Sequence, residues 1–290
     1  LSGYERIKNI SFPTSKPHIS YSEVRVWKEC PYRHKLTYID KIATDEPSPY
    51  LSYGTALHAA LEDFLETKKM NTEIALTQIR SEWEKHGFDS DEWIQGQADY
   101  RASQGWRPKP HNYLPEWLEW AENSLNDIPA FLDSEFDEWE TVSAEEELYE
   151  FVEGYDIFFK GFIDALLKVK IKGKEYYYVL DWKTAGDKGW FASKRRDILT
   201  WAQIALYKSF WMRKNNLDTK QVKCGFVLLK RGASPTQTCE LVKVSVGPKA
   251  EENALSIMRS MVRNVRRGIF LKNRNSCLFC EFKNTQACPG

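Results

Sequence analysis

The chain has 290 residues, of which 42% are hydrophobic and 14% aromatic, and its 41 lysines and arginines balance its 41 aspartates and glutamates. This composition is that of an ordinary globular protein, and the length is sufficient for a sizeable core. No window approaches the roughly 20 consecutive apolar residues of a membrane span, and the first residues lack the basic-then-apolar layout of a signal peptide, so we expect a cytoplasmic protein with no membrane partner.

The charges are unevenly distributed along the chain. A net charge of zero argues against a nucleic-acid partner, because domains that bind nucleic acids are commonly basic. However, residues 133–153 are strongly acidic, whereas residues 183–230 and 263–274 are strongly basic. A neutral total can therefore hide a basic groove.

The first half of the chain has the pattern of helices. Ser20-Tyr21-Ser22-Glu23 fits a capping box, which predicts a helix that ends near Glu29, where Cys30-Pro31 interrupts it. An apolar stripe predicts a second helix over residues 54–68. Helical periodicity returns over residues 73–85 and 115–132. The polar stretch between these two segments, residues 88–113, has no clear period and is predicted to be a loop or lid.

From residue 138 the pattern changes to strands. We predict strands over residues 138–152, 157–169 and 175–182 with tight turns at 154–155 and 172–173, then a helix, two further strands and a last amphipathic helix, over residues 198–214, 222–229, 237–246 and 249–267. This order predicts an α/β (α+β) fold with a mixed central sheet flanked by helices. We expect one integrated domain made of an N-terminal helical region (1–136), a core (137–247) and a C-terminal helix with a Cys-rich tail (248–290).

Four polar residues stand out against this pattern. In a strand Asp181 and Lys183 project to the same side, and a strand buried on both faces would carry this pair to the end of the sheet. If the strands before and after the turn at 172–173 are neighbours, Asp164 approaches Asp181 closely enough for the two carboxylates to share a divalent cation. His58, which shares a helix face with Glu62, could complete the ligand set. Oxygen ligands favour Mg²⁺ or Mn²⁺, and an imidazole favours Mn²⁺.

Each of these residues alone has an ordinary structural explanation, but their joint order resembles the RecB-like branch of the PD-(D/E)XK nuclease superfamily. The matching motifs are Gly54-x-x-x-His58-x-x-x-Glu62, Gly161-Phe162-Ile163-Asp164, Asp181-Trp182-Lys183-Thr184 and Gln203-x-x-x-Tyr207. The resemblance implies a restriction-endonuclease-like core. It also implies a metal site formed by His58, Asp164, Asp181 and the backbone carbonyl of Trp182. Lys183 would orient or activate the attacking water, and Gln203 and Tyr207 would face the site. Ile163 stands where the family name has proline.

The six cysteines fall into two groups. Cys224 and Cys239 sit singly in predicted strands and are expected to be small buried side chains. The tail supplies Cys277, Cys280 and Cys288, and a four-ligand site then needs Cys30, which would join the two ends of the chain. This arrangement resembles the iron-sulfur subgroup of RecB-like nucleases, which includes AddB-type subunits and CRISPR-associated exonucleases, and it implies a structural 4Fe-4S cluster. Zinc remains the alternative, because four thiolates also suit it.

A basic and aromatic segment follows the Asp181 strand. Lys188, Lys194, Arg195 and Arg196 lie among Trp190, Phe191 and Trp201, a mixture that suits single-stranded nucleic acid. We rank Arg263, Arg266 and Arg267 of the last helix lower as DNA contacts.

Together these features favour an Mg²⁺- or Mn²⁺-dependent deoxyribonuclease, an exonuclease acting on single-stranded DNA or free DNA ends. The alternatives are a DNA-end-binding or adaptor module and a zinc-stabilised endonuclease of the same fold. Recombination, DNA repair or processing, and CRISPR adaptation all use such nucleases, in some cases with protein partners, and no residue chooses among them.

Overall fold

The computed structural model describes residues 12–42, 47–105, 107–278 and 280–289, so residues 1–11, 43–46 and 106 of the predicted N-terminal region and residues 279 and 290 of the predicted tail lie outside the described residues. None of the helices in these ranges combines the length and apolarity that a bilayer-spanning segment requires. The regular elements are β1 (His18–Ser20), α2 (Tyr21–Glu29), α3 (Pro31–His34), a π-helix (Lys35–Ile39), α4 (Pro49–Thr67), α5 (Thr72–His86), α6 (Asp91–Ser103), α7 (Leu114–Glu135), β2 (Glu138–Phe151), β3 (Phe158–Ile171), β4 (Lys174–Ala185), α8 (Ala192–Arg196), α9 (Ile198–Lys214), β5 (Val222–Lys230), β6 (Cys239–Val244), α10 (Pro248–Arg266) and a 3-10 turn (Arg274–Ser276).

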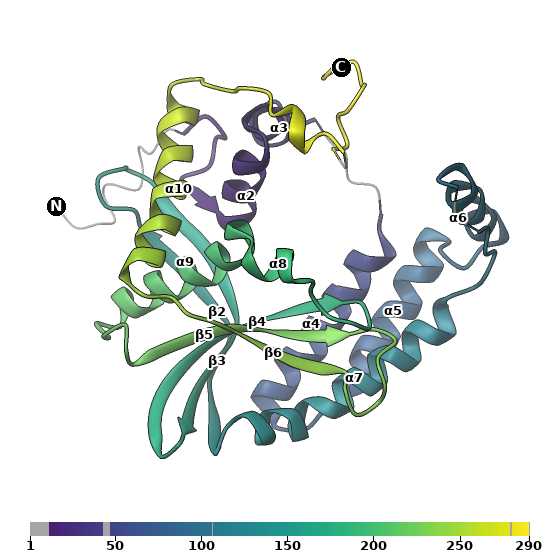
Figure 1. The fold of residues 1–290 in the computed structure, drawn as a ribbon, viewed down its shortest axis with the longest axis horizontal. Helices are drawn as coiled ribbons and strands as arrows, with labels where there is room; N and C mark the ends of the chain where they lie inside the picture. The colour runs from purple at the N-terminus through teal and green to yellow at the C-terminus, as the bar shows by residue number, and fades with distance from the viewer. Residues whose placement is uncertain (1–11, 43–46, 106, 279, 290) are drawn as a thin grey trace.

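A mixed sheet forms the centre of the molecule (Figure 1). β2, β3 and β4 make an antiparallel meander, and β5 lies parallel to β4 and antiparallel to β6. The crossover from β4 to β5 runs through α9, as a parallel connection requires. The predicted mixed sheet flanked by helices is thus confirmed.

Helices cover both faces of this sheet and enclose two hydrophobic cores. On one face α2, α9 and α10 pack over a core that includes Val179 and Phe226. On the other face α4, α5 and α7 pack over a core that includes Leu180 and Trp182. Neighbouring residues of β4 thus enter opposite cores, as the strand alternation predicts. The buried pattern of β4 confirms a strand covered on both faces.

Most predicted helices are found where the sequence places them. Ser20 caps α2 by accepting a hydrogen bond from the backbone N–H of Glu23, as the capping box predicts. The loop predicted over residues 88–113 is wrong in part, because Asp91–Ser103 form α6. Ser90 caps this helix, but Ala98 is the one buried residue of Asp91–Ser103, so no apolar stripe marks the helix in the sequence.

The sheet differs from the prediction at two points. β4 continues to Ala185, whereas the predicted strand ends at residue 182, so the Asp181 and Lys183 pair lies within the strand and not at its end. The short strand β1, which the sequence pattern does not reveal, pairs in parallel with Phe158, Phe159 and Lys160 at the start of β3. Since β2 runs along the whole of β3 on one side, β1 occupies the side that β4 leaves free.

Candidate active site

The sheet forks where the predicted carboxylates lie. β3 and β4 pair from Ile171 and Lys174 up to Ala165 and Leu180, and beyond that point β3 continues beside β1. Asp164 and Asp181 are the next residues on the two strands, at the opening of the fork. Here the backbone N–H of Trp182 donates a hydrogen bond of 2.7 Å to Asp164 Oδ2. The predicted proximity of the two strands at these aspartates is found in the structure.

His58 reaches the fork from α4. Its Nε2 lies 3.1 Å from the carbonyl oxygen of Trp182, and its Nδ1 lies 3.6 Å from Asp164 Oδ2. A carbonyl oxygen only accepts, so the ring proton belongs on Nε2 and the Nδ1 lone pair faces the Asp164 carboxyl group. Burial lowers the pKa of His58, which favours the neutral, ligating imidazole. Two acceptors that face each other suit a cation or a shared proton between them.

Lys183 and Asp181 form an ion pair inside the site. The Lys183 Nζ lies 2.5 Å from Asp181 Oδ2, and only 1% of the Asp181 side chain is exposed. Burial by itself lowers the pKa of Lys183, but the charges of Asp181 and Asp164 outweigh burial and raise it, so the side chain is an ammonium ion. Burial and the charge of Asp181 raise the pKa of Asp164 well above its ordinary value. The metal-free site therefore favours a proton on Asp164 beside the Asp181–Lys183 ion pair.

Gln203 and Tyr207 lie one turn apart on α9 and face the same site. The Gln203 amide is 3.4 Å from the Tyr207 hydroxyl. Burial raises the pKa of Tyr207, and the charges of Asp181 and Asp164 add to this shift. A Cβ atom on Gly161 would lie 2.7 Å from the Tyr207 ring, so this motif glycine is needed for the close approach of α9 to β3.

Glu145 is a site residue that the sequence analysis missed. A ligand atom from each of Glu145, His58 and Asp164 can be chosen so that all lie within 4.8 Å of one another. Burial and the charges of Glu62 and Asp181 raise the pKa of Glu145. A register shift in β2 between residues 141 and 143, and a φ of +49° at Glu145, turn this side chain into the site. Three glutamates in a row, residues 145–147, were the only signal in the sequence.

The predicted basic segment lies next to the site, but its members differ in their surroundings. Lys194 lines a groove of about 230 Å³ together with Lys183, Gln203 and Trp190. Arg195 instead pairs with Glu240 at 2.6 Å. Lys188 and Arg196 are exposed. Lys194 is therefore the member of this set that the groove brings together with the site.

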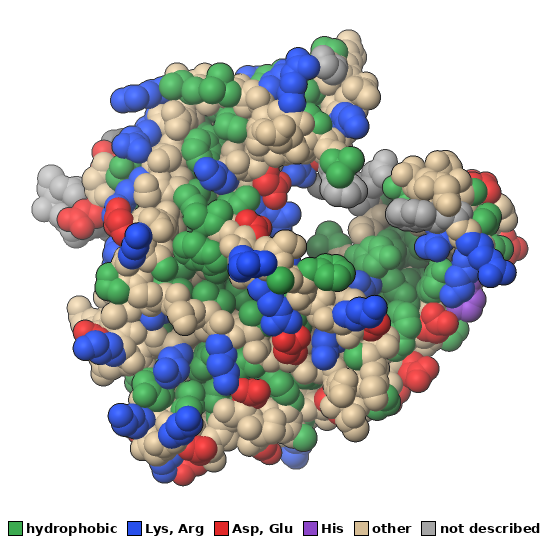
Figure 2. Space-filling model, in the orientation of Figure 1, with side chains coloured by type: hydrophobic (Ala, Val, Ile, Leu, Met, Phe, Trp, Pro, Cys, Tyr) green, Lys and Arg blue, Asp and Glu red, His purple; other side chains and the backbone are tan. Residues whose placement is uncertain are grey.

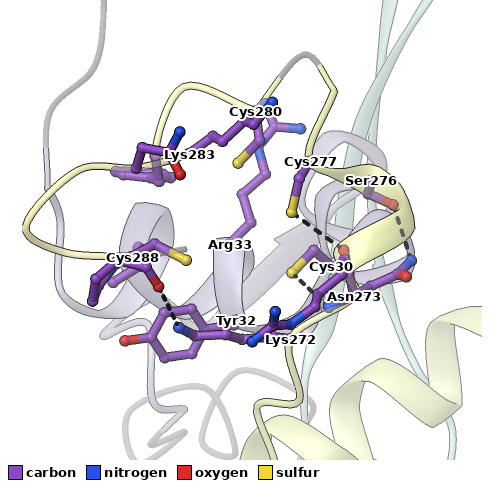
Figure 3. A pocket seen from close by; sticks show the side chains of 15 residues that line it. Cys30, Tyr32, Arg33, Lys272, Asn273, Ser276, Cys277, Cys280, Lys283 and Cys288 are labelled. Carbon is purple, nitrogen blue, oxygen red and sulfur yellow. Dashed lines mark hydrogen bonds between the residues drawn. The ribbon is translucent and has the colours of Figure 1, made fainter.

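The four predicted cluster cysteines come together around one cavity. Cys30, Cys277, Cys280 and Cys288 line a space of about 210 Å³, and Figure 3 shows their sulfur atoms around it. Four thiolates suit both a tetrahedral zinc ion and an iron-sulfur cluster, so the cysteines that line this cavity fit either metal centre.

Direct contacts also tie the tail to the N-terminal helices. Arg33 forms ion pairs with Glu29 and Glu281, each at 2.9 Å. The Asn273 amide and the Ser276 hydroxyl both donate to the carbonyl oxygen of Glu29. Cys224, in contrast, is buried in the sheet, where burial raises its thiol pKa to about 12, as expected for a cysteine that binds no metal.

Comparisons with known proteins bear on the fold and on the family of the chain. A solved structure from Eubacterium rectale, named "putative exonuclease", has a TM-score of 0.51 and 11% sequence identity to this chain, over 92% of this chain and 88% of that chain. At this identity the likeness concerns the fold. No curated protein sequence matches the chain. The family model of the PD-(D/E)XK nuclease superfamily matches residues 18–289, so the restriction-endonuclease-like fold is confirmed and the chain belongs to this nuclease superfamily.

Proposed function

We propose that the protein is a metal-dependent DNA exonuclease of the RecB-like branch, which hydrolyses phosphodiester bonds at DNA ends. The observation that carries this proposal is the convergence of His58, Asp164, and the Asp181–Lys183 pair at one fork of the sheet. These residues come from α4, β3 and β4, so their meeting depends on the fold and not on sequence proximity.

The residues at the fork fit a divalent cation. His58, Glu145 and Asp164 would hold it, and Asp181 and the Trp182 carbonyl lie beside them. The raised pKa values of Asp164 and Glu145 reflect burial together with carboxylate repulsion, and a cation would relieve the repulsion. Oxygen ligands with one imidazole suit Mn²⁺ or Mg²⁺. When bound, the cation supplies Lewis-acid activation of water and of the phosphate.

The other site residues act on the DNA and on the attacking water. Lys183 lines the groove over the site, where its ammonium group can neutralise the charge that develops on the phosphate. Gln203 lines the same groove and orients the Tyr207 hydroxyl. Lys194 adds a second positive charge for the DNA backbone.

We further propose a structural 4Fe-4S cluster held by Cys30, Cys277, Cys280 and Cys288. The cavity that these four cysteines line together supports it. The tail contacts with Glu29 and Arg33 support the view that the N-terminal region, the core and the tail form one integrated domain.

The test is digestion of end-labelled DNA by protein purified without oxygen, with Mn²⁺ or Mg²⁺ as the only divalent cation. The wild type should release short products from DNA ends, and Asp181→Ala should not. Asp89→Ala, which changes an exposed aspartate, is the matched control and should cleave normally. Undiminished cleavage by Asp181→Ala would contradict the proposed site.

A further inference from the structure

A large cleft that the proposed chemistry does not use lies at the start of α4 and past the end of β4. Its volume is about 920 Å³, which is near the upper end of ordinary ligand pockets. It is bounded by α6 and α7, by the start of α4, and by the segments that follow β4 and β5. Figure 2 shows hydrophobic side chains in the hollow between α6 and the body of the molecule, with Lys and Arg side chains on the α6 side.

Aromatic rings form the lining of this cleft. Tyr50 packs against Trp117 at 5.0 Å between ring centroids, and Trp117 packs against Trp83 at the same distance. Trp117 and Trp83 are buried and fix the floor. Tyr50 on α4 and Tyr100 on α6 are 58% and 57% exposed, so two large rings from different helices of the lining stand open to solvent.

Arg231 adds a positive charge that the rings hold in place. Its guanidinium carbon lies 4.7 Å from the Tyr50 ring centroid and 4.9 Å from that of Trp117. No described residue accepts a hydrogen bond from its buried Nε. Among the described lining residues Asp187 is the one acidic side chain, against three basic ones. The cleft therefore combines exposed rings with a net positive charge.

Parts of the cleft lining lie on, or directly after, the same elements that carry the site. Gly186, in its lining, follows Lys183 by three residues, or about 10 Å at a strand rise of about 3.3 Å per residue. Tyr50 precedes His58 by eight residues on α4, or about 12 Å at about 1.5 Å per residue. Both paths match roughly three stacked nucleotides at about 3.4 Å each.

From these features we propose that the cleft binds single-stranded DNA by stacking unpaired bases on Tyr50 and Tyr100, with Arg231 available to a phosphate. This inference rests on the proposed function in that it takes DNA as the substrate, and it assigns the bases to a surface other than the predicted basic segment. Rings stack on any base, so the cleft selects unpaired strands without selecting a sequence. A duplex, whose bases already stack on one another, does not fit this mode.

The experiment compares binding of labelled oligothymidylate and of an abasic strand of the same length, about 12 nucleotides. Fluorescence anisotropy in EDTA measures binding without cleavage. The wild type should bind the oligothymidylate at least about tenfold more tightly than the abasic strand. The double variant Tyr50→Ala/Tyr100→Ala should lose most of this preference and keep its affinity for the abasic strand. Arg231→Gln should weaken binding of both strands and lower the salt dependence by about one charge.

Phe151→Ala is the matched control, because this ring is 37% exposed at the end of β2 and lines neither the cleft nor the groove over Lys183. It should bind both strands as the wild type does. The inference is wrong if the double variant keeps the wild-type preference, if Phe151→Ala loses it, or if the wild type prefers a duplex or shows no preference for bases. Binding is measured without metal and is therefore separate from cleavage. If the double variant cleaves DNA and binds it as the wild type does, the proposal for the cleft is rejected and the nuclease proposal stands. Base-dependent binding without cleavage in Mn²⁺ or Mg²⁺ would reject the nuclease proposal alone.

Discussion

Replacing Gly161 by alanine tests the packing that brings α9 to the site. A Cβ atom at this position would lie 2.7 Å from Cε1 of Tyr207, and 3.3 Å from both Cζ of Tyr207 and Cε1 of Phe159. Both rings are buried, and Phe159 also stacks on Phe210 with centroids 4.6 Å apart. Neither ring can turn away without displacing other core residues.

The magnitude follows from two opposing effects. Alanine in place of glycine within a strand normally stabilises a protein by about 0.5–1 kcal/mol. Overpacking of a filled core costs about 1–3 kcal/mol, and a contact of 2.7 Å with a buried ring belongs to the upper part of that range. We therefore expect Gly161→Ala to lower the free energy of unfolding by about 1–2 kcal/mol.

Chemical denaturation of matched variants measures this effect. Gly54→Ala changes the other motif glycine, whose added Cβ meets nothing within 4 Å, and should stabilise α4 by up to about 1 kcal/mol. Tyr207→Ala removes the clashing ring, so the double variant Gly161→Ala/Tyr207→Ala should lose about 1–3 kcal/mol less than the two single changes combined. If Gly161→Ala is as stable as Gly54→Ala, or if the changes at Gly161 and Tyr207 are additive, the added Cβ does not clash with the Tyr207 ring.

Charged residues of the site and the cysteines of the tail can be tested in the same way. Lys183→Met should slow DNA cleavage about a hundredfold or more while DNA binding persists, as measured by single-turnover digestion. Glu145→Gln should raise the Mn²⁺ concentration needed for half-maximal cleavage about tenfold or more, because it removes one ligand oxygen. Because the pKa of Asp164 is raised in the folded state, the metal-free folded protein binds a proton at Asp164 more readily than the unfolded chain does. The contribution of this proton to the free energy of unfolding is therefore lost as pH rises through that pKa. Since a cation must displace this proton, the increase in Tm on adding Mn²⁺ should grow with pH, and Asp164→Asn should abolish that trend. Cys288→Ser should reduce the iron content and the visible absorbance of protein purified without oxygen, whereas Cys224→Ala should change neither.

A control variant or a contradicting outcome can be named for the changes at Glu145, Lys183 and Cys288. Glu147→Gln alters the exposed partner of Lys160 on the same strand as Glu145 and should leave the Mn²⁺ requirement unchanged. A Lys183→Met variant that cuts DNA at the wild-type rate would remove the lysine from the chemistry. Zinc in place of iron, or iron that Cys288→Ser retains in full, would contradict the cluster but not the nuclease site.

The sequence predicts the order of elements well because the buried strands and helices carry strong periodic patterns. It misses α6, whose polar surface gives no stripe although Ser90 and the acidic residues after it are a recognisable helix start. It also misses Glu145, because a register shift in β2 decides which side chains face the site, and such a shift depends on strand pairing that no local pattern specifies. Asp164 and Asp181 could be paired from the sequence only because a tight turn joins their strands.

The contacts between the C-terminal tail and α2 also shape the proposed DNA groove. Arg25 and Glu29 of α2 line the groove over Lys183, and the backbone carbonyl of Glu29 accepts hydrogen bonds from Asn273 and Ser276 of the tail. The last turn of α2 is therefore positioned by the segment that holds the proposed cluster. Loss of the cluster should loosen this wall of the groove, so Cys288→Ser should weaken DNA binding even though its sulfur lies outside the site. A cluster variant that binds DNA with wild-type affinity would show that the hydrogen bonds to Glu29 suffice to hold the wall in place.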